Sequence, residues 1–316
     1  MRTSTAGLGL ALLSAATFGT SGTFATSLIA TGWTPGAAVL ARVTIAALVL
    51  TGPALLQLRG RWTLLRANLP VVLAFGGFAV GVAQLFFFSA VEHLSVGVAL
   101  LLEYSGVLLV VGWMWLRHGQ RPGRLTVVGG VAAIGGLALV LDLTGSQRID
   151  VVGVLWGLAA AVGLAAYFVI SARTGDSLPP IVTAWSGLVV GAVTLAVLGA
   201  VRLLPMHAST ADVDLGGWQV SWVVPIIGLS VVAAAVAYAA GIGAARRLGA
   251  RLASFVGLSE VLFAVLFAWL LLDQQPTVLQ AVGGVVVLVG IALVRAAERA
   301  PAPDATAVPE PAGTLG

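Results

Sequence analysis

Ten long apolar runs dominate this sequence and constrain the fold more than any other feature. A helix needs about 20 mostly apolar residues to cross a bilayer. Short links with turn residues, such as Thr34-Pro35 and Gln275-Pro276, separate the runs. The sequence therefore predicts an all-α integral membrane protein with ten transmembrane helices. They are expected at residues 7–30, 35–58, 69–91, 95–116, 123–143, 151–172, 180–201, 219–243, 250–272 and 277–296.

Composition excludes several classes of chemistry. Hydrophobic residues make up 59% of the chain and charged residues only 9%, whereas soluble proteins carry about a quarter charged residues. The chain has no cysteine, which excludes disulfides and thiolate metal sites, and all 16 basic residues are arginine. Without lysine, a P-loop and Schiff-base chemistry are excluded. We expect no cofactor and no metal. The net charge of +4 does not indicate nucleic acid, because the arginines lie in short links between apolar runs.

The arginines also predict an orientation. With the N-terminus inside, thirteen arginines fall in inner segments, and only Arg148 and Arg202 fall in outer links. Arginine and lysine favour the cytoplasmic side of a membrane. We therefore expect a multi-pass protein of a bacterial cytoplasmic membrane with both termini in the cytoplasm. The stretch 297–316 is rich in proline and lacks an apolar period, which predicts a disordered cytoplasmic tail.

An internal repeat relates the two halves of the chain. Residues 94–140 align without a gap to residues 248–294, at an offset of 154, and nineteen of 47 positions are identical. The matches include Trp115 with Trp269 and Pro122 with Pro276, which are harder to attribute to biased composition than alanine, valine or leucine.

The repeat predicts two five-helix halves, residues 1–145 and 146–296. Because five is odd, the second half enters the membrane upside down. Inverted repeats are typical of secondary transporters, which hold their substrate near the midplane between the halves. The alternative is a duplication that serves structure alone.

Two glycine pairs recur in the fifth helix of each half. Gly129 and Gly136 are seven residues apart, as are Gly283 and Gly290, so each pair lies on one helix face. Small residues allow helices to approach closely in lipid. We interpret these helices as scaffold.

Two stretches resemble a known family. LSEVLFAVLFAWLLLDQQP (residues 258–276) is similar to the hydrophobic stretch of EamA-type members of the drug/metabolite transporter superfamily. That family typically has Leu-Glu-Pro at the start of this stretch. Here the three positions are Ser259-Glu260-Val261, and Asp273 closes the run. VGVALLLEYSGVLLVV (residues 96–111) resembles the threonine/homoserine exporter branch. The resemblance implies efflux of small amino acids or related polar metabolites.

Glu103 and Glu260 each interrupt an apolar run. At 1.5 Å per residue, Glu103 lies about 13 Å below the outer face and Glu260 about 15 Å above the inner face, so both are near the midplane. A charge there costs roughly 3 kcal/mol, so each should face the protein interior or a wet cavity. Burial favours the neutral form, so either could exchange a proton, and an ionised carboxylate could hold a substrate ammonium group. The alternative is a hydrogen bond to another helix.

Other polar groups inside the predicted helices could line the same cavity. Arg42 could bind a substrate carboxylate, pair with Glu103, or have a structural or gating role. At the offset of 154, Gln84 corresponds to Tyr238. The remaining candidates for substrate binding are Tyr104, Ser21 and Tyr167. Hydrogen bonding between helices is the alternative for each.

Together these features predict a transporter that exports its small-molecule substrate by alternating access, driven by protons or by the substrate's own gradient. An integral-membrane enzyme acting on lipid-linked substrates would need clustered carboxylates, histidines or metal ligands. A channel would need rings of charge or a carbonyl filter, and a scaffold subunit is the remaining alternative. We therefore expect no enzymatic activity. Substrate identity, coupling ion and oligomeric state are left open by the sequence.

Overall fold

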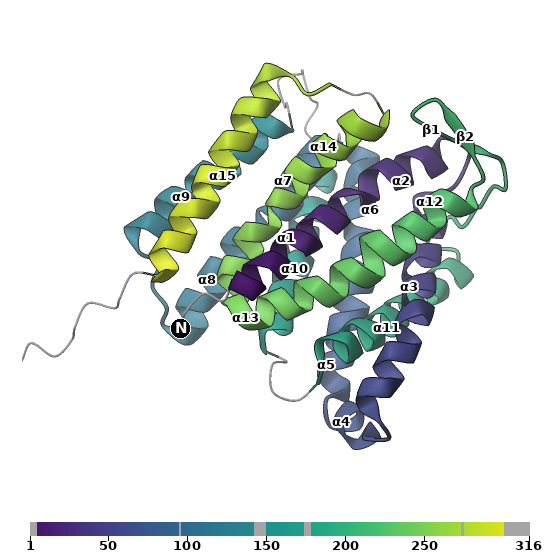
Figure 1. The fold of residues 1–316 in the computed structure, drawn as a ribbon, viewed down its shortest axis with the longest axis horizontal. Helices are drawn as coiled ribbons and strands as arrows, with labels where there is room; N and C mark the ends of the chain where they lie inside the picture. The colour runs from purple at the N-terminus through teal and green to yellow at the C-terminus, as the bar shows by residue number, and fades with distance from the viewer. Residues whose placement is uncertain (1–4, 95, 142–149, 174–177, 273–274, 300–316) are drawn as a thin grey trace, which may run out of the picture.

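The protein is a bundle of long helices with one short hairpin, as described by a computed structural model covering residues 5–94, 96–141, 150–173, 178–272 and 275–299 (Figure 1). The first half contains α1 (Thr5–Gly19), α2 (Ser21–Ile29), α3 (Pro35–Leu58), α4 (Trp62–Ala67), α5 (Leu69–Leu73), the π-helix η1 (Ala74–Val82), α6 (Ala83–His93), α7 (Val96–Tyr104), α8 (Gly106–His118) and α9 (Arg124–Val140). The second half contains α10 (Val151–Arg173), α11 (Pro180–Ala200), β1 (Val213–Leu215), β2 (Trp218–Val220), α12 (Val223–Ile227), the π-helix η3 (Gly228–Val236), α13 (Ala237–Gly257), α14 (Ser259–Leu272) and α15 (Val278–Arg299).

The helices are long and apolar enough for a multi-pass membrane protein. Within the described ranges, eight helical segments have the length and hydropathy to cross a membrane, and two further apolar helices, Arg124–Val140 and Ser259–Leu271, are shorter. One of the eight, Val223–Gly257, is 35 residues long and contains parts of the predicted eighth and ninth helices. The number of ten crossings therefore stays a prediction.

Several boundaries differ from the prediction. Trp218–Val220 forms strand β2, antiparallel to β1, so the helix expected from residue 219 begins at Val223. Helix α13 runs through the expected link and is interrupted only at Gly249, which has φ 80° and ψ 162°. Non-glycine residues rarely adopt that conformation, so glycine is needed at the bend. Helix α15 continues to Arg299, three residues into the predicted tail; residues 300–316 lie outside the described part.

The internal repeat has a counterpart in the backbone. Among the described residues two π-helices occur, η1 at Ala74–Val82 and η3 at Gly228–Val236, and their first residues are separated by the same offset of 154 residues. A π-helix has i→i+5 hydrogen bonds and is rare in proteins. Its occurrence at equivalent positions supports the alignment of the two halves independently of the matching side chains.

The fifth helices of the two halves, α9 and α15, pack side by side (Figure 1). A Cβ atom on Gly129 would lie 2.7 Å from the carbonyl oxygen of Gly290, and one on Gly136 would lie 2.8 Å from that of Gly283. Because a later residue of α9 meets an earlier residue of α15, the helices are antiparallel. The predicted glycine packing is confirmed, and the antiparallel contact is what an inverted repeat requires.

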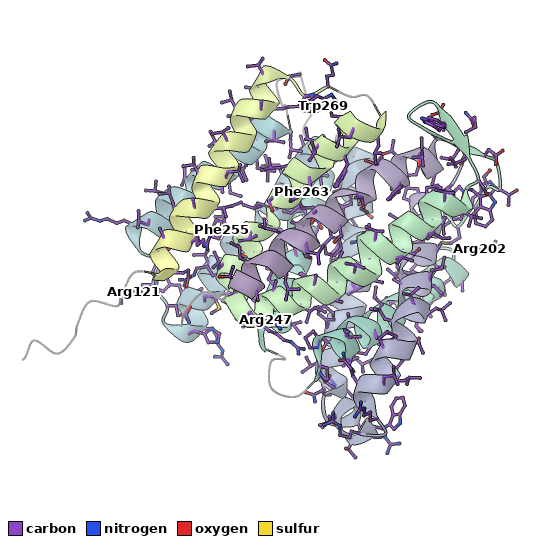
Figure 2. The ribbon with its side chains drawn as sticks, viewed as in Figure 1. Arg121, Arg202, Arg247, Phe255, Phe263 and Trp269 are labelled. Carbon is purple, nitrogen blue, oxygen red and sulfur yellow. The ribbon has the colours of Figure 1, made fainter. Side chains whose placement is uncertain are left out.

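The links assigned to the two sides of the membrane lie at opposite ends of the bundle. Arg121 and Arg247 lie at one end of the molecule, near the N-terminus, and Arg202 and Trp269 lie at the opposite end (Figures 1 and 2). This arrangement agrees with the arginine-based assignment of an inner and an outer end, and the two ends are named accordingly below.

Candidate functional site

A cavity of about 660 Å³ lies within the bundle, between helices of both halves. All eight residues proposed from the sequence line it. They are Ser21, Arg42, Gln84, Glu103, Tyr104, Tyr167, Tyr238 and Glu260. They come from α2, α3, α6, α7, α10, α13 and α14, so only the tertiary structure brings them together.

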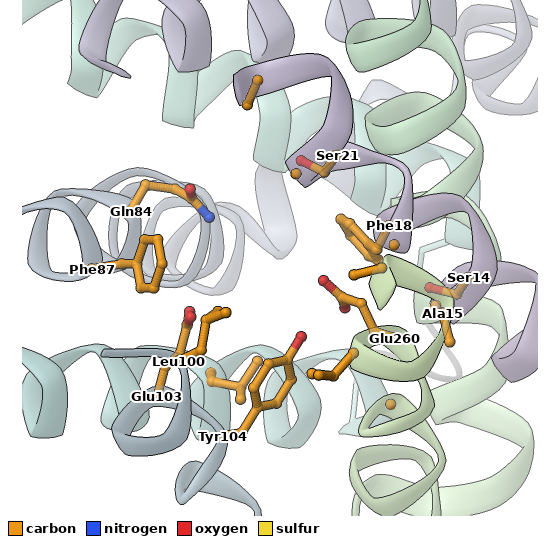
Figure 3. A pocket seen from close by; sticks show the side chains of 18 of the residues that line it. Ser14, Ala15, Phe18, Ser21, Gln84, Phe87, Leu100, Glu103, Tyr104 and Glu260 are labelled. Atoms are coloured by element: carbon orange, nitrogen blue, oxygen red, sulfur yellow. The ribbon is translucent and has the colours of Figure 1, made fainter. Parts of the chain in front are cut away.

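The two glutamates face this cavity from opposite halves of the protein. Glu103, near the end of α7, and Glu260, in the first turn of α14, approach the same space from opposite sides (Figure 3). Both are half-buried, and both line the cavity. The Tyr104 hydroxyl points toward Glu260 (Figure 3). One cavity therefore contains an acidic group from each half of the protein.

Each glutamate lies next to a break between two helices. Helix α7 ends at Tyr104 and α8 begins at Gly106; α13 ends at Gly257 and α14 begins at Ser259. At each break a serine hydroxyl donates to the carbonyl three residues earlier: Ser105 to Leu102 over 2.5 Å, and Ser259 to Val256 over 2.7 Å. This repeated local hydrogen bond competes with the regular helix pattern.

Packing explains why the glutamates are not at equivalent positions. The equivalent of Glu260 in the first half is Gly106, where a Cβ atom would collide with the Ala161 carbonyl of α10. The equivalent of Glu103 is Gly257, where a Cβ atom would lie 2.9 Å from the ring of Phe168, also in α10. Each glutamate thus stands at a position whose equivalent in the other half is a glycine that allows close contact with α10.

Arg42 is buried in the cavity wall, and its guanidinium contacts other residues of the protein. Its Nη2 donates to the Ala233 carbonyl of η3 over 2.6 Å, and the guanidinium carbon lies 5.7 Å from the centre of the Phe18 ring. Its Nε is buried without a hydrogen-bond partner. Among the described residues no ion pair joins Arg42 to Glu103 or Glu260. Of the alternatives for Arg42, the pairing with Glu103 is therefore not formed in this conformation.

Aromatic rings form the deeper part of the cavity. Tyr238 contacts Phe18 and Tyr167 edge-to-face, with ring centroids 5.1 and 5.8 Å apart. The Tyr167 hydroxyl is buried without a hydrogen-bond partner. Ser14 Oγ donates to the Ala237 carbonyl over 2.9 Å, which fixes α1 against α13.

Sequence reasoning missed several residues of the wall. Ser14 and Phe18 precede Ser21 on α1 and α2, and Phe87 follows Gln84 by three residues on α6 (Figure 3). These residues lie three or seven positions from a proposed residue, and this helical spacing was the signal that could have identified them. Phe87 belongs to a phenylalanine run whose more common role is packing. Thr17, one residue before Phe18, donates to the Leu13 carbonyl of its own helix over 2.7 Å.

The cavity extends toward the outer end of the bundle. Its wall includes Thr26 and Ile29 near the end of α2 and Pro35 at the start of α3, all at the outer ends of their helices. Toward the inside it reaches Ala11 and Ala244, well before the inner ends of the helices.

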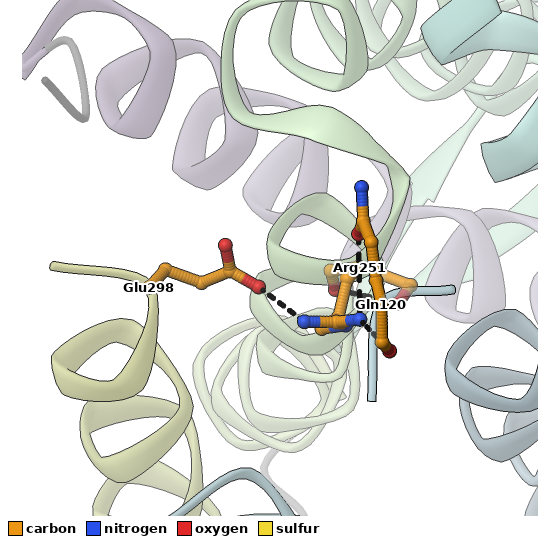
Figure 4. A network of polar contacts seen from close by, with 4 residues as sticks. Gln120, Arg251 and Glu298 are labelled. Atoms are coloured by element: carbon orange, nitrogen blue, oxygen red, sulfur yellow. Dashed lines mark hydrogen bonds and ion pairs between the residues drawn. The ribbon is translucent and has the colours of Figure 1, made fainter. Parts of the chain in front are cut away.

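Polar contacts connect the inner ends of the helices. Arg251 donates to Glu298 Oε1 over 3.1 Å and to the Gln120 carbonyl over 2.9 Å, which joins the two halves (Figure 4). Arg246 donates to the Leu178 carbonyl and to Thr183 Oγ1. The cavity therefore extends outward while polar contacts join the inner ends.

Comparisons with known proteins agree with this architecture. A family model described as the EamA-like transporter family matches residues 5–142 and 151–296, one match in each half. A crystal structure whose title states no function is similar over 93% of this chain and 97% of its own, with a TM-score of 0.74 and 19% sequence identity. That likeness shows a shared fold. No curated protein sequence matches significantly. Among the described residues no group of three histidine, aspartate or glutamate side chains could hold a metal ion.

Proposed function

The chain belongs to the EamA-like transporter family of the drug/metabolite transporter superfamily, and we propose that it exports a small amino acid or a related polar metabolite. One observation carries the proposal. Glu103 and Glu260, one from each half, line a single cavity of about 660 Å³. The threonine/homoserine branch is the substrate class that the sequence resemblance favours, and it stays part of the proposal.

The charges of the cavity suit a substrate with an ammonium group. An unpaired charge near the midplane costs roughly 3 kcal/mol, and a carboxylate that meets an ammonium group recovers part of that cost. Arg42 adds a binding group for a substrate carboxylate. A guanidinium has five N–H donors, and the structure records one hydrogen bond from Arg42, to Ala233. An amino-acid zwitterion would satisfy groups of both signs.

The energy source would be an ion or substrate gradient. The chain has no lysine, so it has no P-loop with which to use ATP. A half-buried carboxylate can release a proton when it binds a cationic substrate, which would couple the two movements. Glu260, toward which the Tyr104 hydroxyl points, is our first choice for this role and Glu103 the second.

Alternating access would follow from the repeat. In the proposed cycle the halves 1–145 and 146–296 exchange conformations, which closes the outer side and opens the inner side. The antiparallel α9–α15 pair supports this cycle, because it relates the two halves by an approximate two-fold axis.

Flux measurements test the proposal. Purified protein is reconstituted in liposomes loaded with labelled small amino acids and amines, and efflux is measured with and without a pH gradient. We expect efflux of at least one zwitterion above that of empty liposomes. Removal of one charge-assisted hydrogen bond by Glu260→Gln should reduce the flux about tenfold or more. Flux equal to that of empty liposomes across the panel refutes the proposal.

Matched variants separate the site from general effects on folding. Asp214→Asn neutralises an exposed carboxylate in β1, far along the chain from the cavity residues, and should transport as wild type. Glu103→Gln tests the second carboxylate. If both glutamine variants transport normally, the glutamates do not have the proposed role.

A further inference from the structure

A second cavity, also of about 660 Å³, lies in the membrane-spanning part of the protein and shares no lining residue with the first. It is bounded by the first turns of α1, the junction of α13 and α14, and the C-terminal half of α15. Its lining residues are Leu8, Leu12, Val256, Ser259, Leu288, Ile291, Ala292, Arg295 and Ala296. We call this cavity the α1–α15 groove.

The groove is apolar and open to the side. Leu12 is 40% exposed and Leu288 is 53% exposed, although both lie within helices apolar enough to span a membrane. Surface of this kind on a membrane helix faces hydrocarbon rather than water. Of the nine lining side chains, only those of Ser259 and Arg295 are polar, and the Ser259 hydroxyl is already bound to the Val256 carbonyl.

Arg295 is the exception in this apolar wall. Among the described residues, no hydrogen bond or ion pair satisfies its guanidinium, and its Nε is buried without a partner. The nearby Arg251, whose Nε also has no partner, differs because its two Nη atoms donate to Glu298 and to the Gln120 carbonyl. A guanidinium at the edge of hydrocarbon needs an anion, and its planar donors match a phosphate group in particular.

The location of Arg295 indicates which membrane leaflet would supply that anion. It lies one turn before the end of α15, on the side where thirteen arginines place the inner face. The inner leaflet is the one that carries anionic phospholipids. At the offset of 154, the equivalent residue of the first half is Leu141, so the repeat does not place an arginine at the outer counterpart of the groove.

We propose that the α1–α15 groove binds an anionic glycerophospholipid of the inner leaflet. One acyl chain lies between Leu12 and Leu288, and the phosphate accepts hydrogen bonds from Arg295. This site is independent of the transported substrate, because it depends only on the groove, the arginine and the orientation in the membrane.

Lipid retention tests the proposal. Delipidated full-length protein is mixed with equal amounts of phosphatidylglycerol and phosphatidylcholine that have identical acyl chains, and bound lipid is measured by native mass spectrometry. We expect wild type to retain phosphatidylglycerol about tenfold better, as one charge-assisted phosphate contact predicts. Arg295→Gln should bring the two lipids close to parity. Arg61→Gln is the matched control, because Arg61 is exposed and its guanidinium donates to the Gln57 carbonyl at the end of α3.

Two further measurements make the outcome decisive. Ala292→Leu narrows the groove without changing charge, and we expect reduced retention of both lipids; it also serves if Arg295→Gln does not fold. Excess inorganic phosphate should not displace the lipid, because phosphate lacks the acyl chain. The proposal is overturned if wild type does not prefer the anionic lipid, if Arg295→Gln keeps the preference, or if phosphate alone removes the lipid.

Discussion

Replacement of Gly136 by alanine tests the close contact between α9 and α15. A Cβ atom at this position would lie 2.7 Å from the Val287 amide nitrogen, 2.8 Å from the Gly283 carbonyl oxygen and 3.0 Å from Val286 Cβ. Favourable contacts of carbon atoms begin at about 3.5 Å. Two of the three neighbours are backbone atoms that cannot rotate away, so α9 and α15 must separate by roughly half an ångström or more.

The expected loss follows from two opposing terms. Overpacking of a tight contact costs about 1–3 kcal/mol. Alanine in place of glycine favours the helix by about 1 kcal/mol. We therefore expect Gly136→Ala to lower the free energy of unfolding by roughly 1–2 kcal/mol. Gly135, on the same helix, is exposed and has no atom within 4 Å of an added Cβ, so Gly135→Ala should leave stability unchanged or raise it by up to about 1 kcal/mol.

Both variants can be measured by titrating a denaturing detergent into protein held in a mild one, with loss of helical circular dichroism as the signal. The informative quantity is the difference between the two variants, because both make the same chemical change one residue apart. Equal stabilities for Gly136→Ala and Gly135→Ala would refute the close packing of α9 on α15. A Gly136→Ala variant more stable than wild type would refute it as well.

Three further predictions concern other parts of the molecule. Arg251→Ala should increase maleimide labelling of a cysteine introduced at Ala244, at the inner end of the cavity, by up to about fivefold, because a partly exposed ion pair contributes about 1 kcal/mol or less. The parent protein has no cysteine, and Arg61→Ala is the control. Unchanged labelling would contradict the role of Arg251 in holding the inner ends of the helices together. Gly249→Ala should lower the free energy of unfolding by about 1–3 kcal/mol, because φ 80° and ψ 162° strain any other residue, and a wild-type denaturation midpoint would argue against the bend. Arg42→Lys should keep the fold, seen as a wild-type elution profile, but reduce efflux about tenfold, because lysine lacks the planar donors; wild-type efflux would exclude Arg42 from substrate binding.

The eight residues proposed for the site could be found without coordinates because a polar group in an apolar run is costly. That cost indicates that such groups face inward, but it does not indicate which of them meet. The structure places Ser21, Gln84 and Glu103 at one cavity, although they lie on different helices. The role of each as a substrate contact stays a prediction until flux is measured.

The partners of Arg42 could not be predicted, for a definite reason. Its hydrogen bond goes to the Ala233 carbonyl, which belongs to the π-helix η3. Residues of η3 and η1 are the same apolar types that form α-helices, so no sequence signature distinguishes them. The bend at Gly249 was missed because a glycine within an arginine-rich inner segment equally fits an open link.

The sequence by itself determined that the chain lies in lipid, that its two halves repeat, and that the polar groups within the apolar runs face inward. Each of these depends on how the side chains of one segment interact with lipid or align with those of a second segment. It also determined the glycine faces of α9 and α15, which follow from helical period alone. Only the tertiary structure decided that Glu103 and Glu260 share one cavity, that this cavity extends outward, and that the Arg295 Nε is buried with no partner among the described residues. These facts depend on distances between helices remote in the chain, and local pattern carries no information about such distances.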